Sequence, residues 1–248
     1  MDPSNLRYTI IIPCFNSEKW LSTSIESALN QTYKNTELIV IDNESSDRSL
    51  QIAQSYSDRA TIGTAKNIYK HSYQEPVEEA LKMATGDYFT ILGSDDFIEP
   101  TYIENLNKII STDPSRINFL QSPLIGVQSD TGQSVGEIKH EYRSLTEFKK
   151  LLFERSPVCT PTMVFKKSLY DNGTVRWNSE KYLGASDYDL YFRLADKGYF
   201  IFAYPRWLGY YYRWHDDQAT WGMHKENALS NFDNMIQSYW KDKWNDKT

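Results

Sequence analysis

Residues 86–96 read GDYFTILGSDD, a run of β-branched and aromatic residues that ends in a glycine, a serine and two adjacent aspartates. The part from Tyr88 to Leu92 has the composition of a strand buried on both faces of a parallel sheet. Adjacent carboxylates raise each other's pKa, so they need either solvent or a cation, and divalent cations prefer such oxygen ligands. The stretch predicts a metal site at a sheet edge, or a solvated turn that contains two aspartates.

Two earlier strands, each followed by a helix, show the alternation that is typical of an α/β fold. The runs YTIIIP at 8–13 and ELIVI at 37–41 are strand-like, and each precedes a helical pattern with an apolar stripe. A short strand at 60–62 and a helix that begins near Pro76 lead into the strand at 88–92. This alternation predicts a doubly wound, mostly parallel sheet, which binds ligands at the carboxyl ends of its strands.

The second half has a mixed pattern. Strands are expected at 118–121, 162–165, 200–204 and 208–214, and helices at 187–197 and 225–240. In the first half, we expect Ser17 to cap the helix that follows the first strand, and a second helix to span 47–56. No internal repeat or flexible linker divides the chain, which predicts one domain over residues 1–248.

Composition argues against several classes of protein. A net charge of −6 argues against a nucleic-acid partner, because a phosphate-backbone reader carries a basic face. The two cysteines, Cys14 and Cys159, form no CxxC pair, so we expect reduced thiols. No secretory signal pattern and no apolar run near the ~20 residues of a membrane span are present. We therefore expect a cytoplasmic protein, at most peripheral at the inner face of the membrane.

Side chains with binding chemistry follow other strand ends. Asp42 ends the second strand and can accept a hydrogen bond from a ribose hydroxyl or a base, or it can simply start a turn. Phe15, beside Asn16 after the first strand, can stack on a base or fill the core. Because the carboxyl ends of parallel strands meet at one edge, we expect Asp42, Asp95 and Asp96 to share one site.

Two further clusters come from the second half. Residues 186–189 read SDYD and open the expected helix at 187–197. Carboxylates are favoured there by the helix dipole, and one that faces the cleft can serve as a general base. Arg213 can bind phosphate oxygens in a bidentate way, and His215 can bind a metal or a phosphate, although a lone histidine is more often structural.

Five motifs, taken in order, resemble glycosyltransferase family 2 of the GT-A fold. They are IIIPCFN at 10–16, LIVIDNESSD at 38–47, GDYFTILGSDD at 86–96, ASDYDLYFRLADKGY at 185–199 and YYRWH at 211–215. Each motif is weak alone, but their order and spacing make a specific signal. The resemblance implies a nucleotide-sugar-binding half at about 8–115. It also implies an acceptor-binding half at about 116–248 with a C-terminal helix.

The resemblance also implies how the donor is held. Pro13, Phe15 and Asp42, with Asn16 beside them, would surround the nucleotide base, which is uracil in most relatives. Asp95 would lie near the ribose and the metal. These roles imply a UDP-sugar as the favoured donor.

The remaining implied roles concern the metal and the reaction. Asp96 would coordinate the Mn²⁺ or Mg²⁺ that bridges the diphosphate, and His215 would touch that metal. Arg213 would close over the diphosphate, and Asp187 matches the catalytic base. The implied reaction is a single displacement with inversion, in which a hydroxyl of a saccharide or a lipid-linked saccharide attacks the sugar.

The chain departs from the family pattern at four places. Gly93 replaces the first aspartate of L-D-S-D-D, and Ser186 replaces the glutamate of E-D-x-D. The second acidic turn, more often D-D-G-S, reads DNES at 42–45. A common A-R-N stretch is absent between 63 and 80, where Lys66 or Lys70 would supply the positive charge. The two aspartates that define the metal motif remain, so metal binding is still expected.

Other readings stay open. The fold also suits a non-catalytic sugar- or nucleotide-binding module and, less well, a sugar nucleotidyltransferase, which needs a glycine-rich loop after the first strand. The segment 239–244 interleaves aromatic and basic residues, a pattern found in membrane contact, although packing of its tryptophans on the core is favoured. Trp177 and Tyr182 are candidates for the acceptor pocket. The donor sugar, the acceptor and the oligomeric state do not follow from the sequence.

Overall fold

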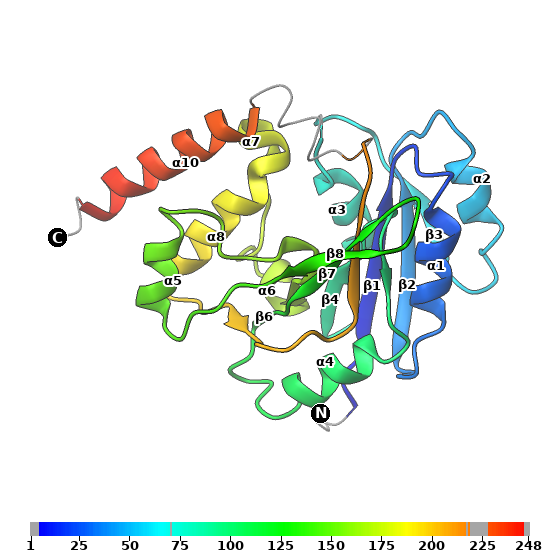
Figure 1. The fold of residues 1–248 in the computed structure, drawn as a ribbon, viewed down its shortest axis with the longest axis horizontal. Helices are drawn as coiled ribbons and strands as arrows, with labels where there is room; N and C mark the ends of the chain where they lie inside the picture. Colours follow the sequence, from blue (N-terminus) through cyan, green and yellow to red (C-terminus); the bar gives the residue numbers. More distant parts are fainter. Residues whose placement is uncertain (1–4, 70, 217, 219–227, 246–248) are drawn as a thin grey trace.

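A computed structural model describes residues 5–69, 71–216, 218 and 228–245. Within them, the strands form a seven-stranded sheet and a smaller four-stranded sheet (Figure 1). The larger sheet contains β1 (Tyr8–Cys14), β2 (Thr36–Asp42), β3 (Thr61–Thr64), β4 (Tyr88–Ile91), β6 (Phe119–Gln121), β9 (Val164–Lys166) and β10 (Phe202–Ala203). The smaller sheet contains β5 (Phe97–Ile98), β7 (Leu124–Gln128), β8 (Ser134–Ile138) and β11 (Tyr210–Trp214).

The larger sheet has the order β10-β6-β9-β4-β1-β2-β3. β1 pairs in parallel with both β2 and β4, and β2 pairs in parallel with β3. β9 is the exception, because it runs antiparallel to both of its neighbours, β4 and β6. The expected doubly wound, mostly parallel sheet is therefore confirmed.

Helices cover both faces of this sheet. In chain order they are α1 (Leu21–Leu29), α2 (Ser49–Gln54), α3 (Gln74–Met83), α4 (Tyr102–Ile110), α5 (Leu145–Leu151), α6 (Lys167–Asp171), α7 (Ser179–Tyr182), α8 (Ser186–Asp196) and α10 (Ala228–Asn245). Two 3₁₀ turns, η2 (Thr160–Thr162) and η3 (Leu183–Ala185), precede β9 and α8. In Figure 1, α1 and α2 lie at the right, and α5, α8 and α10 at the left.

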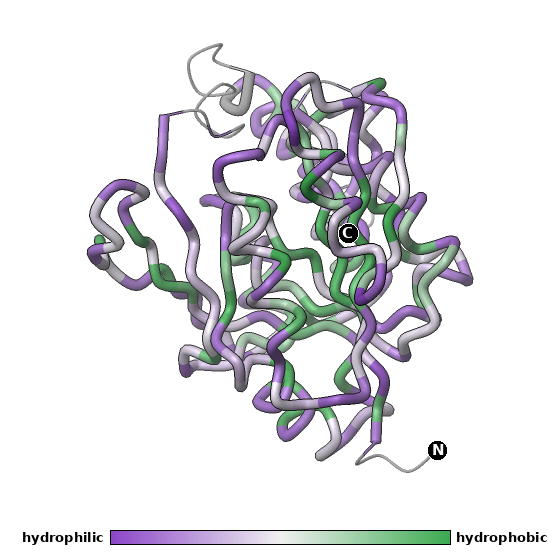
Figure 2. The backbone as a smooth tube through the Cα atoms, turned by 90° about the vertical axis from the view of Figure 1, so that its right-hand side faces the viewer, coloured by the Kyte–Doolittle hydropathy of each residue, from purple (hydrophilic) through white to green (hydrophobic). Residues whose placement is uncertain are grey.

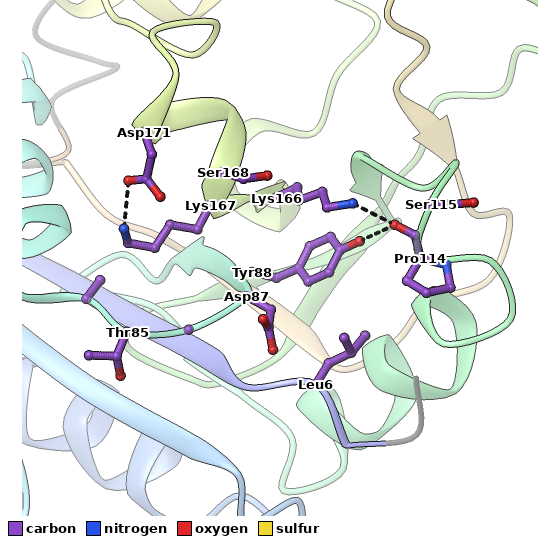
Figure 3. Close-up of a pocket in the computed structure, with 12 residues that line it drawn as sticks. Leu6, Thr85, Asp87, Tyr88, Pro114, Ser115, Lys166, Lys167, Ser168 and Asp171 are labelled. Carbon is purple, nitrogen blue, oxygen red and sulfur yellow. Dashed lines mark hydrogen bonds and ion pairs between the residues drawn. The ribbon is translucent and has the colours of Figure 1, made fainter. Parts of the chain in front are cut away.

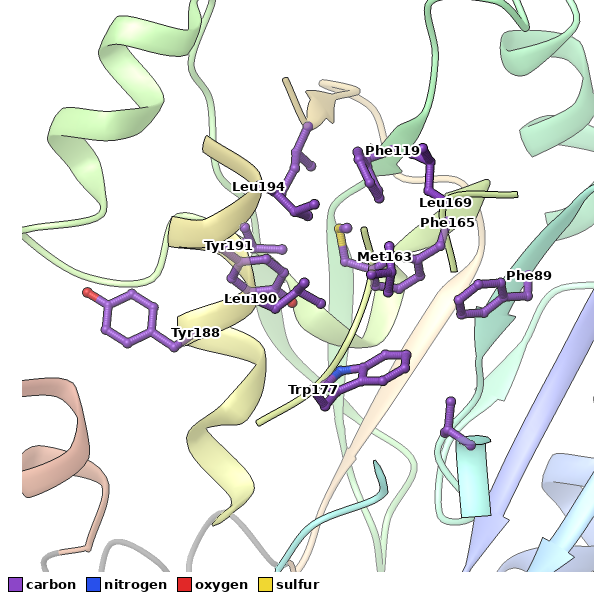
Figure 4. Close-up of a cluster of buried hydrophobic side chains, with 14 of the residues drawn as sticks. Phe89, Phe119, Met163, Phe165, Leu169, Trp177, Tyr188, Leu190, Tyr191 and Leu194 are labelled. Carbon is purple, nitrogen blue, oxygen red and sulfur yellow. The ribbon is translucent and has the colours of Figure 1, made fainter. Parts of the chain in front are cut away.

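The alternation of side chains along each strand divides the core in two. Ile10 and Ile12 of β1 face the cluster that contains residues of α1 and α4. Ile11 faces the other cluster, which contains residues of α3, α8 and α10. Figure 4 shows the part of that second cluster in which α8 contributes Tyr188, Leu190, Tyr191 and Leu194. The hydrophobic segments of the backbone run through the middle of the molecule (Figure 2).

Several expected boundaries were wrong. Ser17 does not cap α1 with its side chain, because the helix begins at Leu21 and the Ser17 hydroxyl bonds to Phe15 and Ser94 instead. The strand expected at 162–165 begins only at Val164, after the 3₁₀ turn η2. The final helix is described from Ala228 onward, and the expected start at residue 225 lies outside the described residues.

The C-terminal helix uses its tryptophans for packing. Trp240 is buried and stacks on Phe192, with ring centroids 5.8 Å apart, and Trp244 packs against Phe153 and Phe192. For the segment 239–244, the sequence favoured packing of the tryptophans on the core over membrane contact, and the structure has this packing. Among the described residues, no helix combines the length and the apolar character that a membrane crossing requires.

Candidate active site

The candidate site lies at the carboxyl edge of the larger sheet. The strand order changes direction between β1 and β4, since β2 and β3 extend the sheet on one side and β9 and β6 on the other. Such a switch point leaves a crevice outside the strand ends, where open α/β sheets bind their ligands. The segments after β1, β2 and β4 carry most of the residues that the sequence singled out.

Asp96 is buried in the turn after β4 and has a donor on each oxygen. The Tyr210 hydroxyl donates to Oδ2 at 2.7 Å, and the backbone N–H of Arg213 donates to Oδ1 at 2.8 Å. Burial, and then the neighbouring Asp95, raise the pKa of Asp96 well above its ordinary value. Both donors belong to β11, so Asp96 joins the turn after β4 to the smaller sheet.

The side chain of Asp95, next to Asp96, contacts His215. Its Oδ2 lies 2.9 Å from His215 Nε2, and the two side chains are 27% and 13% exposed, respectively. A carboxylate oxygen and an imidazole nitrogen are thus side by side and open to a ligand. The two neighbouring aspartates have different surroundings, one fully satisfied within the protein and one accessible.

The guanidinium of Arg213 lies over two aromatic rings. Its guanidinium carbon is 4.3 Å from the centroid of Trp20 and 5.1 Å from that of Phe97. Its Nε–H donates to the backbone carbonyl of Asp95 at 2.7 Å. Burial lowers the pKa of Arg213, and the two nearby carboxylates oppose this. The aromatic contacts and the Nε bond hold the guanidinium beside the Asp95–His215 pair.

The residues at the ends of β1 and β2 form a second part of the site. Phe15 is 49% exposed just beyond β1, whereas Asp42 is buried and accepts from the Ser45 backbone N–H at 3.1 Å. Next to Asp42, the buried Asn43 Oδ1 has no hydrogen-bond partner among the described residues. A buried acceptor without a donor costs free energy that a bound ligand can recover.

Pro13 and Asn16 support this part of the site. Pro13 is half-buried inside β1, opposite Ile41 of β2. Asn16 has φ of 49°, a left-handed conformation that asparagine tolerates. Its Oδ1 accepts from the Ser46 backbone N–H at 2.8 Å. The Asn16 carboxamide thus joins the loop after β1 to the loop after β2.

Asp187 lies at the start of α8 and contacts the 3₁₀ turn η2, which leads into β9, the neighbour of β4. The Thr160 hydroxyl donates to Asp187 Oδ2 at 2.8 Å. Thr90 of β4 is paired with Val164 of β9, and β9 runs antiparallel, so η2 lies beyond the carboxyl end of β4. Asp187 and the turn 93–96 therefore occupy the same edge of the sheet. Burial raises the pKa of Asp187 above its ordinary value, and the Thr160 hydrogen bond partly opposes the rise.

Asp189, the second carboxylate of the SDYD run, has a different environment. It is 3% exposed, and its Oδ2 accepts from Arg193 Nε at 2.8 Å. Its Oδ1 accepts from Trp240 Nε1 at 3.2 Å. Asp189 therefore links α8 to α10 and faces away from the sheet edge.

Trp177 and Tyr182, the sequence candidates for an acceptor pocket, are both buried in the core. Trp177 packs against Phe165 (Figure 4). It also packs against Tyr73. Ser186, which takes the place of the family's glutamate, accepts a hydrogen bond from Ser179. Lys66 is exposed, and Lys70 lies outside the described residues.

Sequence reasoning missed three residues that shape the site: Trp20, Thr160 and Tyr210. From the sequence, Trp20 belongs to the apolar face of the helix expected after the first strand. Tyr210 is one of several tyrosines in the strand expected at 208–214. Nothing local marks either residue, because their partners lie far away in the sequence. For Thr160 the sequence offers no such signal, because only the antiparallel direction of β9 places the residues before that strand at the carboxyl edge of β4.

A cavity of about 560 Å³ lies elsewhere, at the amino edge of the sheet (Figure 3). It is lined by residues that precede β1 and begin β4, including Leu6, Asp87 and Tyr88. Its two lysines already have partners, since Lys166 donates to the Pro114 carbonyl and Lys167 pairs with Asp171. The cavity is thus opposite the edge that carries the acidic and aromatic residues, and we do not assign the chemistry to it.

A scan against protein families matches residues 9–173 to the model described as Glycosyl transferase family 2. The chain belongs to glycosyl transferase family 2. An uncharacterized glycosyltransferase of Rickettsia typhi is 32% identical over 198 residues, which is 75% of this chain and 57% of the relative. The Escherichia coli protein named UDP-Glc:alpha-D-GlcNAc-diphosphoundecaprenol beta-1,3-glucosyltransferase WfaP is 36% identical over 105 residues, which is 42% of this chain and 41% of that protein.

Solved structures share the fold of this family 2 chain. TarS 1–349 of S. aureus, in complex with UDP-GlcNAc, has a TM-score of 0.68 at 19% identity, and the match covers 87% of this chain and 61% of that 1–349 chain. A mannosyltransferase of Pyrobaculum calidifontis, in complex with GDP-Man and Mn²⁺, has a TM-score of 0.62 at 14% identity, covering 93% of this chain and 64% of that protein. The family resemblance and the expected fold are confirmed, and the chain spans less than two thirds of the length of these proteins.

Proposed function

We propose that this chain transfers a sugar, with inversion, from a UDP-sugar to a hydroxyl of a saccharide or lipid-linked saccharide. One observation carries the proposal. The accessible Asp95–His215 pair and Arg213 share one sheet edge with Phe15 and with Asp187. Base, diphosphate and acceptor hydroxyl are the three groups that such a reaction must bind.

The donor half of the site suits a nucleoside diphosphate. Phe15 offers an exposed ring on which a base can stack. Asp42, at the end of the neighbouring strand β2, holds the loop after that strand by accepting from the Ser45 backbone N–H. The Escherichia coli relative is named for UDP-Glc, and the two structural neighbours are in complex with UDP-GlcNAc and GDP-Man. The two uridine nucleotides among these three support uridine as the base.

The residues present fit a divalent cation. Among the described residues no group of three or more His, Cys, Asp and Glu side chains could hold a metal by itself. Mg²⁺ and Mn²⁺ sites of this kind need one or two protein ligands and take the rest from substrate phosphates. Asp95 and His215 supply such a pair, whereas both oxygens of Asp96 already have donors. We propose Asp95 and His215 as the ligands, and Asp96 as the residue that holds their turn in place.

The remaining chemistry is carried out by the chain's own residues. When bound, the cation supplies charge neutralisation for the leaving diphosphate. Arg213, held over Trp20 and Phe97, donates hydrogen bonds to phosphate oxygens as negative charge develops on them. Asp187 accepts the proton of the attacking hydroxyl, and attack opposite the leaving group inverts the anomeric centre.

Calorimetric titration of UDP, GDP and TDP, with and without Mn²⁺, tests the donor site. We expect Mn²⁺-dependent binding of UDP that Asp95→Ala abolishes. Asp58→Ala removes an exposed carboxylate that precedes β3 at the opposite edge, and it should bind UDP like the wild type. Failure of the folded protein to bind any of the three nucleotides would contradict the proposed function. Binding without release of UDP from any UDP-sugar would favour a non-catalytic module.

A further inference from the structure

Asp187 is the end of a short chain of hydrogen bonds. The Tyr191 hydroxyl donates to Thr160 Oγ1 at 2.9 Å, and Thr160 Oγ1 donates to Asp187 Oδ2 at 2.8 Å. The other oxygen of Asp187, Oδ1, accepts from the backbone N–H of Tyr188 at 2.7 Å. Each carboxylate oxygen thus has one donor, which fixes the rotation of the carboxylate about its own axis.

Thr160 stands on a rigid turn. Gln121 Oε1, just at the end of β6, accepts from the Cys159 backbone N–H at 2.7 Å. The Thr162 hydroxyl bonds to the Ser122 backbone at both its carbonyl and its N–H, and Thr90 of β4 donates to the Met163 carbonyl at 3.0 Å. All of these groups are buried. The segment that carries Thr160 is therefore fastened to the ends of two strands of the main sheet.

The direction of donation follows from protonation. Burial, followed by the charge of Asp187, raises the pKa of Tyr191 well above its ordinary value, so its hydroxyl keeps its proton and donates. The single Thr160 proton then points at Asp187. The titratable groups that face Asp187 are Tyr191 on α8 and Tyr73 before α3, whose pKa values burial raises first and the Asp187 charge raises further. Both are neutral, so within the described part of the chain no cation competes with Thr160 for the carboxylate.

We propose that Thr160, itself oriented by Tyr191, is a positioning residue that holds Asp187 at the sheet edge for proton transfer from the acceptor hydroxyl. The inference rests on the proposed function, in which Asp187 is the base. It adds a hydroxyl from a separate segment of the chain, beyond the end of β4, which ties the base to the strand that carries the diphosphate-binding turn.

The first test needs no substrate. In protein labelled with ¹³C at aspartate Cγ, the Asp187 resonance is assigned by its loss in Asp187→Asn and then titrated with pH. Thr160→Val removes a donor to the carboxylate while keeping the shape of the side chain. The Asp187 midpoint should therefore rise by about one pH unit. Thr160→Ser keeps the hydroxyl and should keep the wild-type midpoint. An unchanged midpoint in folded Thr160→Val would overturn the proposal.

The second test uses UDP release from UDP-GlcNAc with Mn²⁺. Because the base must be ionised, a higher pKa in Thr160→Val moves the acid limb of the kcat profile to higher pH, while KM for the donor stays unchanged. A structural defect would instead lower kcat at every pH, in Thr160→Ser as well as in Thr160→Val. Thr131→Val, in the exposed turn between β7 and β8, should match the wild type.

Two outcomes separate this inference from the proposed function. If Asp187→Asn keeps its turnover, the base assignment fails, whatever the titration of Thr160→Val shows. If Asp187→Asn loses turnover but Thr160→Val keeps the wild-type midpoint and profile, only the role of Thr160 fails. Should Thr160→Val not fold, Tyr191→Phe replaces it, and a smaller rise of the Asp187 midpoint is expected because Thr160 loses its orienting donor.

Discussion

The Tyr210 hydroxyl donates to Asp96 Oδ2 at 2.7 Å, and the two residues are 114 positions apart in the sequence. Tyr210 belongs to the smaller sheet and Asp96 to the turn that leaves the larger one. The same hydroxyl accepts from the Gly93 backbone N–H at 3.2 Å. The Tyr210 hydroxyl thus bonds to the first and the last residue of the turn 93–96. These two bonds hold the backbone of the turn, and with it the position of the accessible Asp95.

Gly93→Ala tests how closely this turn is packed. A Cβ at Gly93 would stand 2.6 Å from Asp96 Oδ2 and 2.9 Å from Asp95 Oδ1. The Asp96 carboxylate cannot move without losing the buried donors of β11, so we expect Mn²⁺-dependent UDP affinity to fall at least tenfold by calorimetry, about 1.4 kcal/mol. Gly132→Ala is the control. Nothing lies within 4 Å of its added Cβ, but its φ of 66° strains alanine, so it should lower Tm and leave UDP affinity unchanged.

Phe15→Ala tests base stacking. Stacking on an aromatic side chain contributes about 1–3 kcal/mol per base, so we expect UDP to bind roughly tenfold more weakly. The free energy of unfolding should change little, because the ring is 49% exposed. Phe202→Ala removes another exposed ring, on β10 at the far end of the sheet, and should bind UDP normally. Equal UDP affinity in Phe15→Ala and Phe202→Ala would show that Phe15 does not touch the base.

Asp187→Asn and Asp189→Ala should affect different properties. Asp187→Asn should abolish transfer and leave UDP affinity nearly intact. Asp189→Ala leaves Arg193 without its partner and Trp240 without its acceptor. We expect a loss of roughly 2 kcal/mol of unfolding free energy in urea, with turnover retained, because Arg193 is 26% exposed and keeps some contact with water when the pair is broken. Loss of turnover in a folded Asp189→Ala protein would reassign the base.

Trp20→Leu tests the platform under Arg213. Cation–π contact with the indole contributes about 0.5–2 kcal/mol, so without it we expect weaker UDP binding, by a factor of roughly 3 to 30. The effect should be smaller for UMP than for UDP, because the proposal assigns Arg213 to the diphosphate. Calorimetry with both nucleotides measures the difference, and an equal loss for UMP and UDP would place Trp20 at the nucleoside instead.

The sequence predicted the elements whose signal is local. β1, β2 and β4 are apolar runs buried on both faces, and their periodicity is visible without any partner. The doubly wound, mostly parallel sheet followed from the alternation of these strands with helices, whereas the switch point between β1 and β4 is visible only in the strand pairing. The helices α4 and α5 and the hairpin β7–β8 were not expected. β8 is exposed along its whole length, so it lacks the apolar alternation that identifies a strand.

Site residues divided in the same way. Local sequence identifies three of the site residues, because they lie at or after the end of a strand or at the start of a helix: Asp42, Asp95 and Asp187. The different surroundings of Asp95 and Asp96 could not be read from two identical letters, because Tyr210 and Arg213 create the difference from the other half of the chain. The same holds for Thr160, whose partners are 27 and 31 positions away.

The reversed direction of β9 has a consequence for how this architecture can diversify. At the carboxyl edge of the sheet, a parallel strand ends, so the segment that follows it lies there. An antiparallel strand begins at that edge, so the segment that precedes it lies there instead. The segment between β8 and β9 therefore reaches the carboxyl edge without passing through β1, β2 or β4. Its residues can change in length and composition while these three strands keep their positions. Under the proposed function, acceptor specificity can therefore change while the donor site stays the same.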